Sequence, residues 1–163
     1  MKAARPKSRL ADLTIRAAEP ADADTLTRIA HAAKRHWGYP DAWIALWRAD
    51  LTVTAEFIRA HSVYCAIAGA EIIAFYALSQ EHGAFELEHL WVDPPYLRRG
   101  VGRRLLHHAA HLVRSVGGSS LTIVADPNAE AFYRRLGARR VGAVRSQPPG
   151  RELPLLVLEV NAT

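Results

Sequence analysis

The stretch from Leu90 to Leu106 has the residue types and the spacing of a site that binds an anion. A β-rich run ends at Asp93-Pro94-Pro95, and glycines follow at Gly100 and Gly102, where a helix is expected to begin. The first turn of a helix leaves backbone N–H groups unpaired at the positive end of its dipole, and glycine lets a phosphate oxygen approach them closely. Four arginines lie beside the glycines: Arg98, Arg99, Arg103 and Arg104.

A Gly-x-Gly turn is weak evidence by itself, because a helix start that needs an unusual backbone turn also uses glycine. The common phosphate-binding motifs do not match this stretch. A Walker loop requires Gly-Lys-Ser/Thr after four intervening residues, which the chain lacks. A dinucleotide fingerprint requires a third glycine where this chain has Leu105.

The distribution of charge favours a small polyanionic ligand over a nucleic acid. The net charge is +5, and residues 1–9 contribute four positive charges and no negative one, which leaves +1 for the rest of the chain. The basic residues of that rest are concentrated between Leu97 and Arg140, where the only acids are Asp126 and Glu130. A long phosphate backbone would require an extended basic surface rather than this compact zone.

The elements that must position the loop follow from hydrophobic periodicity and from start and stop residues. Strands are predicted at 13–16, 63–67, 71–78, 85–92, 121–124, 140–144 and 153–160. Helices are predicted from Pro20 to Gly38, at 41–48, at 54–59, from Val101 to Val116 and at 128–136. This order gives an antiparallel front, one strand-helix-strand crossover and a closing hairpin. We therefore expect a mixed α/β (α+β) fold in one domain, residues 13–163, after a disordered basic tail, residues 1–12.

Two segments of the chain resemble the GNAT superfamily of acetyl-CoA-dependent N-acetyltransferases. The first, Leu-x-Val-x-Pro and then Tyr-x-Arg-Arg-Gly-Val-Gly-x-x-Leu-Leu, is similar to the family's motif A. The second, Asn128 to Ala138, is similar to the segment Asn-Ala-x-x-Phe-Tyr-x-x-x-Gly-Phe of many members. The chain departs from the pattern at Leu97, where Gln or Arg is usual, and at Ala138, where an aromatic residue is usual. The resemblance extends from Leu13 to Val160.

The resemblance implies a central, mostly antiparallel sheet of about seven strands, flanked by helices and splayed at the cofactor site. Acetyl-CoA would be the acyl donor. The pantetheine arm would bind the backbone of Leu90, Trp91 and Val92. The pyrophosphate would bind the backbone N–H groups of Arg98, Arg99, Gly100, Val101, Gly102 and Arg103. Asn128 either caps the helix that follows or hydrogen-bonds the cofactor.

Direct transfer of the acetyl group to a primary amine needs an uncharged amine, a positioned carbonyl and a proton for the leaving thiolate. The resemblance implies that Tyr133 supplies that proton; otherwise it is a packed tyrosine of an amphipathic helix. For the base we consider Glu86 and Glu88, which we expect on one strand face with Leu90 and Val92, or a chain of water molecules. Either glutamate could instead be a solvated edge residue.

Other residues that could do chemistry have simpler explanations. The only cysteine, Cys65, lies in a predicted buried strand and is expected to be a core residue. His107 and His111 have the i,i+4 spacing of metal ligands, but the zinc-protease pattern needs Glu where His108 stands, so we expect a solvated face and no metal site. Trp43 and Trp47 lie where the family's variable first helices shape the acceptor site, and they are either core or pocket residues.

A catalytically silent acyl-CoA-binding domain, acting as a sensor or docking a partner, is the main alternative to an enzyme. The acceptor stays open among polyamines, aminoglycosides, amino acids and protein N-termini. The single cysteine fits a cytoplasmic location, and no run of the chain is apolar enough for a membrane span. The resemblance also raises a homodimer as an expectation.

Overall fold

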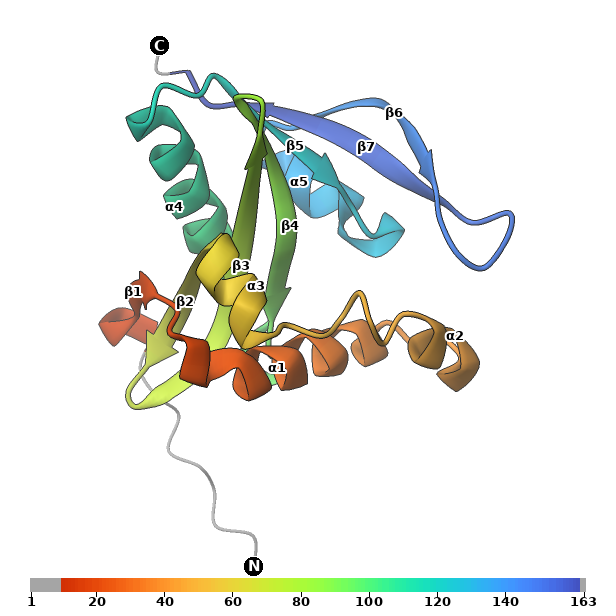
Figure 1. Cartoon of the computed structure of the whole chain (residues 1–163), viewed down its shortest axis with the longest axis horizontal. Helices are drawn as coiled ribbons and strands as arrows, with labels where there is room; N and C mark the ends of the chain where they lie inside the picture. The colour runs from red at the N-terminus through yellow and green to blue at the C-terminus, as the bar shows by residue number, and fades with distance from the viewer. Residues whose placement is uncertain (1–9, 162–163) are drawn as a thin grey trace, which may run out of the picture.

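The computed structural model describes residues 10–161, which form an open seven-stranded sheet with helices on both faces (Figure 1). The strand order is β1-β2-β3-β4-β5-β7-β6, and all neighbours are antiparallel except β4 and β5. The strands are β1 (Thr14–Ala17), β2 (Ser62–Ala68), β3 (Glu71–Glu81), β4 (Ala84–Val92), β5 (Ser120–Val124), β6 (Arg139–Arg145) and β7 (Glu152–Glu159). This architecture confirms the predicted fold class.

Five α-helices connect and cover the strands, and four short 3-10 turns accompany them in the described part of the chain. The helices are α1 (Ala23–His36), α2 (Asp41–Leu46), α3 (Ala55–Ala60), α4 (Val101–Ser115) and α5 (Glu130–Arg135). The turns are η1 (Leu10–Asp12), η2 (Pro20–Asp22), η3 (Pro94–Tyr96) and η4 (Pro127–Ala129). η1 falls inside the segment expected to be a disordered tail, and Leu10 packs against the core. The other residues of that segment, 1–9, lie outside the described residues.

Two clusters of buried side chains, one on each face of the sheet, hold these layers together. The α4-side core lies between the sheet and α4 and α5, and contains Tyr76, Leu105, Ala109, Leu121 and Leu156 among its members. The α1-side core lies between the sheet and α1, α2 and α3, and contains Leu26, Ile29, Trp47, Ile58 and Phe75 among its members. Both helix layers are amphipathic because their apolar residues recur at helical spacing, as in α1 and α4.

The sheet splays between its two parallel strands. β4 and β5 pair only where residues 85–87 face residues 121–123. Beyond this point β4 continues beside β3 as far as Val92, whereas β5 continues beside β7 as far as Val124 (Figure 1). The backbone of residues 88–92 therefore has no strand on its β5 side. This confirms the splay that the resemblance implied.

A β-bulge in β4 corrects the predicted facing of its side chains. The register on β3 shifts between Ala77, which pairs with His89, and Leu78, which pairs with Leu87, so Glu88 is the extra residue. As a result Leu87 and Leu90 both pack on the α4-side core, although strict alternation would put them on opposite faces. The expectation that Glu86 shares a face with Leu90 and Val92 is therefore wrong.

The closing hairpin of β6 and β7 carries a loop from the far edge of the sheet toward the first helices. β7 lies between β5 and β6, so the loop that joins β6 to β7 projects beyond the strand ends and approaches α2 (Figure 1). There the indole Nε1–H of Trp47 donates to the carbonyl oxygen of Gln147 at 2.9 Å. This contact ties the hairpin loop to the segment that follows α2.

Candidate active site

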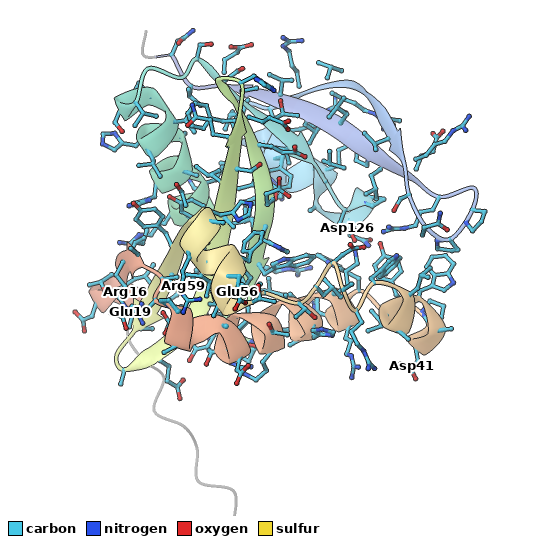
Figure 2. All side chains as sticks on the ribbon, in the orientation of Figure 1. Arg16, Glu19, Asp41, Glu56, Arg59 and Asp126 are labelled. Atoms are coloured by element: carbon cyan, nitrogen blue, oxygen red, sulfur yellow. The ribbon has the colours of Figure 1, made fainter. Side chains whose placement is uncertain are left out.

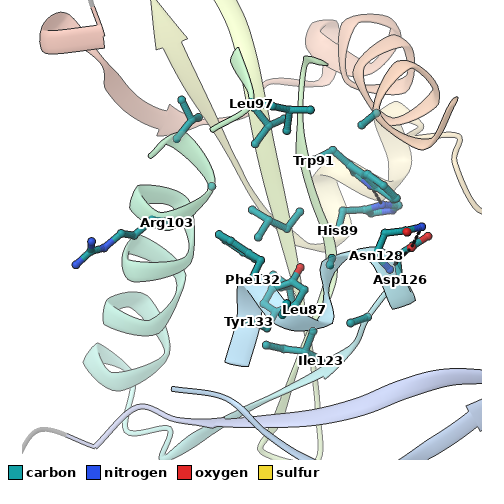
Figure 3. A pocket seen from close by; sticks show the side chains of 18 of the residues that line it. Leu87, His89, Trp91, Leu97, Arg103, Ile123, Asp126, Asn128, Phe132 and Tyr133 are labelled. Carbon is teal, nitrogen blue, oxygen red and sulfur yellow. Dashed lines mark hydrogen bonds between the residues drawn. The ribbon is translucent and has the colours of Figure 1, made fainter. Parts of the chain in front are cut away.

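A cavity of about 700 Å³ opens where β4 and β5 diverge (Figure 3). It collects most of the residues that the sequence indicated for the cofactor and for catalysis. These are Glu88, Leu90, Trp91, Val92, Arg98, Gly100, Val101, Gly102, Arg103, Asn128 and Tyr133. Glu86 and Arg99 do not line it. Glu86 lines a second cavity, and the Arg99 guanidinium lies 5.9 Å from the centre of the Tyr96 ring.

The loop that precedes α4 and the first turn of α4 carry a row of unpaired backbone donors beside this first cavity. Among the described residues, the N–H groups of residues 98–103 have no hydrogen-bond acceptor. The first i→i−4 hydrogen bond of α4 runs from the Arg104 N–H to the Gly100 carbonyl. Arg98 and Gly100 have φ angles of +61° and +80°, in the left-handed region. Alternating left-handed residues turn consecutive N–H groups to one side, which forms an anion-binding concavity at the positive end of α4.

The arginines between Leu97 and Arg140 have different roles in the structure. Arg98 and Arg135 line the first cavity. The Arg103 side chain points away from it, so Arg103 contributes its backbone there (Figure 3). Arg134 and Arg140 form ion pairs with Glu130. The cavity thus combines an anion cradle, nearby cations and an apolar channel, which fits the nucleotide phosphates and the pantetheine arm of a coenzyme A thioester.

Tyr133 lies on α5 at the floor of the first cavity, and its hydroxyl points into it (Figure 3). The residue is 6% exposed, and no other described residue hydrogen-bonds the hydroxyl. Burial, and then the charge of Asp126, raises the pKa of Tyr133 above its ordinary value. The hydroxyl therefore keeps its proton at neutral pH and has a free position for a partner in the cavity.

Asn128 does not cap the helix, which corrects one of the two alternatives for it. Asp126 is the N-cap of η4, and its carboxylate accepts the Asn128 backbone N–H at 2.9 Å. The Asn128 side chain instead donates from Nδ2 to Asp126 Oδ1 at 3.0 Å (Figure 3). It also donates from Nδ2 to the Tyr39 hydroxyl at 3.1 Å. Its position in the first cavity leaves the role of cofactor binding as a prediction.

Glu86 and Glu88 occupy a second cavity of about 470 Å³. The two cavities share a wall made of Leu87, Glu88, His89, Trp91, Val124 and Asp126. Glu88 Oε1 accepts a hydrogen bond from the Ser79 hydroxyl at 2.6 Å. Burial raises the pKa of Glu86, and the charge of Glu88 raises it further. Glu88 thus lies at the junction of the two cavities, and Glu86 lines the second cavity near that junction.

His89 was missed by the sequence reasoning, although it lies in the shared wall. The Trp91 indole Nε1–H donates to His89 Nδ1 at 3.0 Å (Figure 3). Because Nδ1 accepts, the neutral ring carries its proton on Nε2. Burial lowers the pKa of His89 to about 4, so the ring is neutral at pH 7. The only sequence signal was its place in β4 between Glu88 and Trp91.

A buried polar cluster, made of Lys34, Tyr39, Asp126 and Arg151, was also missed. Lys34 Nζ donates to Asp126 Oδ2 at 2.6 Å, and Tyr39 donates to the same carboxylate at 3.0 Å. Although burial raises the pKa of Asp126, the hydrogen bond and charge of Lys34 outweigh it, so that the pKa lies below its ordinary value. One signal was available: Lys34 follows Ala30 by one helical turn, on the apolar side of α1.

Cys65 and the histidines of α4 lie outside the first cavity. Cys65 is fully buried in the α1-side core, as predicted, and burial raises its pKa to about 12. His107 and His111 are exposed, but His108 is not: its Nδ1 lies 2.7 Å from the Tyr76 hydroxyl, against the expectation of a solvated face. Within residues 10–161 no group of side chains is arranged to hold a metal ion, and no helix is long and apolar enough to cross a bilayer.

Comparisons with known proteins agree with this geometry. The model of the acetyltransferase (GNAT) family matches residues 24–138. The peptidyl-lysine N-acetyltransferase YjaB of Salmonella typhimurium is 28% identical over 116 residues, which cover 69% of this chain and 74% of the relative.

Two solved structures share the fold of the chain. The PaiA N-acetyltransferase from Thermoplasma acidophilum, in complex with coenzyme A, is similar with a TM-score of 0.75 and 19% identity over 91% of this chain and 99% of the other. The ribosomal-protein-S18-alanine N-acetyltransferase from Escherichia coli is similar with a TM-score of 0.69 and 20% identity over 93% and 96% of the two chains. Since the family model spans most of the chain, this protein belongs to the acetyltransferase (GNAT) family, and it transfers an acetyl group from acetyl-CoA.

Proposed function

We propose that this enzyme acetylates a primary amine by direct transfer, with Tyr133 as the general acid. The observation that carries the proposal is the Tyr133 hydroxyl, which is buried, protonated and free of any partner among the described residues, and which points into the first cavity. The relative from Salmonella supports a primary amine as acceptor, because its name assigns it a peptidyl lysine. The acceptor would enter through the second cavity, which meets the first at their shared wall.

Each residue would have a defined task in the transfer. The N–H groups of residues 98–103 hold the pyrophosphate, and the free edge of β4 holds the pantetheine arm. Acetyl-CoA supplies a thioester, whose carbonyl carbon forms the new bond to nitrogen as its bond to sulfur breaks. Tyr133 gives its proton to the leaving sulfur. Glu86 or Glu88, directly or through water, takes the proton that the amine nitrogen loses, and the phenolate of Tyr133 is reprotonated from solvent.

Direct transfer is supported by the position of the only thiol. Cys65 lies in the α1-side core and lines neither cavity, so it is not placed to form an acyl-enzyme. Its pKa of about 12 also keeps it a thiol at neutral pH, which is the unreactive form.

A silent acyl-CoA-binding sensor differs from this proposal in one measurable respect, turnover. A screen of polyamines, aminoglycosides, amino acids and lysine peptides, with release of the coenzyme A thiol as the readout, tests the proposal. Thiol release that depends on an amine supports an enzyme, whereas tight acetyl-CoA binding with no release for any amine would favour the sensor.

We also propose a cellular compartment, a class of partner and an oligomeric state for the enzyme. We place it in the cytoplasm because a chain with one buried cysteine suits a reducing compartment. We assign it no nucleic-acid partner because much of its basic zone is used in ion pairs and in the anion cradle. A homodimer is part of the proposal on the resemblance alone, and sedimentation would test it.

A further inference from the structure

The second cavity has a basic end that the proposed chemistry does not use. Lys34 and Arg151 line it together with Trp47 and Asp126. The side chains of Lys34, Arg151 and Asp126 are only 9%, 10% and 6% exposed, so these charges are largely removed from water. Figure 2 shows Asp126 between the first helices and the loop of the closing hairpin, which are the elements that bring the two cations to it.

One carboxylate serves both cations. Asp126 Oδ2 lies 2.6 Å from Lys34 Nζ and 3.5 Å from Arg151 Nη2. Within residues 10–161, no other acid is within ion-pair distance of either cation. The cluster therefore has a formal charge of +1. A buried charge without a counter-ion is costly, and burial accordingly lowers the pKa of Lys34 against the pull of Asp126.

Aromatic rings offset part of this cost and fix the position of the cations. The Arg151 guanidinium lies 4.4 Å from the centre of a Trp47 ring, and Lys34 Nζ lies 4.5 Å from it. The Tyr39 hydroxyl accepts from Arg151 Nη2 at 3.1 Å. The guanidinium has five N–H donors, and Arg151 makes only three side-chain hydrogen bonds with described residues. It therefore has donors left for a ligand in the cavity.

The rest of the cavity has the opposite charge. Glu86, Glu88 and Asp50 line it, and the indole of Trp91 and the ring of Phe57 form apolar parts of its wall. A volume of about 470 Å³ lies in the range of small-molecule sites. The cavity thus offers carboxylates for an ammonium group, apolar rings for a carbon chain, and a buried cluster of charge +1 for an anion.

From this arrangement we infer that the acceptor is a small amine that also carries a carboxylate, and that Arg151, supported by Lys34, binds the carboxylate. A monoanion matches the charge of the cluster, whereas a phosphate dianion would leave an excess negative charge. Arg151 still has its Nε–H and one Nη1–H, and a hydrogen bond from either to a carboxylate is strengthened by the opposite charges. This inference rests on the proposed function, because it names the substrate class for the same transfer.

The test compares amino acids with the amines that lack only the carboxylate. The pairs are phenylalanine and 2-phenylethylamine, lysine and 1,5-diaminopentane, leucine and 3-methylbutylamine, and 5-aminopentanoate and butylamine. For the best pair, we expect wild-type kcat/KM to favour the acid by about 10-fold or more, since a hydrogen-bonded charge is removed with the carboxylate. We also measure kcat/KM for O-phosphoethanolamine, which carries a phosphate in place of the carboxylate, and for a lysine peptide with blocked ends, which carries no free carboxylate.

Substitutions of Arg151 test whether the preference for the acid depends on the buried polar cluster. Arg151→Gln should reduce the preference for the acid to near unity, mainly by lowering kcat/KM for the acid, while Arg151→Lys should keep part of it. Arg145→Gln, an exposed arginine of β6 that lines neither cavity, is the matched control and should keep the full preference. If Arg151 acted in folding alone, Arg151→Gln would lower kcat/KM equally for the acid and the amine of a pair. Acetyl-CoA affinity checks that each variant is folded.

Equal or better use of the decarboxylated amines in all pairs would overturn the inference, and so would a preference for the acid that survives Arg151→Gln unchanged. Better use of O-phosphoethanolamine or of the blocked lysine peptide would also overturn it. Calorimetric titration of the coenzyme A-loaded enzyme with the same pairs measures the preference without turnover. If no amine releases thiol, the proposed function fails, while the calorimetric comparison still decides whether the cluster binds a carboxylate.

Discussion

Gly102 packs against the ring of Phe132. A Cβ atom at Gly102 would lie 3.2 Å from Phe132 Cζ, closer than ordinary van der Waals contact. The two residues belong to the two segments that carried the family resemblance: Gly102 lies in the first turn of α4, and Phe132 lies in α5. A side chain at position 102 would therefore push the Phe132 ring by a few tenths of an ångström, so the close packing of the two segments favours glycine there, in addition to any close approach of phosphate. Gly100 has a different requirement: its surroundings are open, but its φ angle of +80° disfavours other residues.

Substitution of these glycines should distinguish the effect of a negative charge on acetyl-CoA binding from the effect of an added side chain on stability. We expect Gly100→Asp and Gly102→Asp to abolish measurable acetyl-CoA binding, because each puts a negative charge at the phosphate cradle. Gly100→Ala should cost about 1 kcal/mol of stability from backbone strain but retain binding. Calorimetric titration, with the melting temperature as a folding control, gives both quantities. Wild-type affinity in both aspartate variants would show that the loop holds no phosphate.

The nucleotide should contribute much of the affinity for the acyl donor. Acetyl-pantetheine has the same thioester and the same arm but cannot reach the N–H groups of residues 98–103. Several hydrogen bonds to a charged group are lost with the pyrophosphate, so we expect acetyl-CoA to bind at least about 100-fold more tightly. Competition binding against a fluorescent coenzyme A derivative would measure the ratio. A ratio near one would place the donor elsewhere.

The half-buried imidazole of His89 should make the fold sensitive to mild acid. Its pKa is about 4 in the folded chain, against an ordinary value of 6.5, so between these pH values the unfolded chain binds the extra proton. The contribution of His89 to the free energy of unfolding should therefore be constant above pH 6.5. It should fall by roughly 3 kcal/mol as the pH drops from 6.5 to 4.

His89→Gln isolates this contribution, because a glutamine can still accept the Trp91 indole N–H but does not titrate. His31 and His108, whose pKa values burial also lowers, titrate in both proteins and cancel in the comparison. Urea unfolding of both proteins from pH 4.5 to 7.5 gives the difference. Parallel curves across this range would mean that His89 is not the buried neutral group described here.

The sequence alone could predict those parts of the site that depend on local pattern. The loop around Gly100 and the helix α4 follow from residue types and spacing within one segment of chain, whereas a role for Tyr133 came from the family resemblance of residues 128–138. The facing of Glu86 was predicted wrongly, because the bulge at Glu88 is set by pairing with β3 and not by the sequence of β4. The cluster of Lys34, Asp126 and Arg151 was not predictable, since its members lie 92 and 25 positions apart and meet only through the tertiary fold.

The central claim is that Tyr133 donates a proton in the transfer step, and Tyr133→Phe tests it most directly. The substitution removes a hydroxyl that hydrogen-bonds no described residue and keeps the buried ring, so the melting temperature and the affinity for acetyl-CoA should barely change. With the best amine, kcat should fall by about 10²- to 10⁴-fold, the usual contribution of a general acid or base, provided that thiolate departure limits the rate. A folded variant that binds acetyl-CoA and keeps full turnover across the pH range would contradict the claim and make Tyr133 a packing residue.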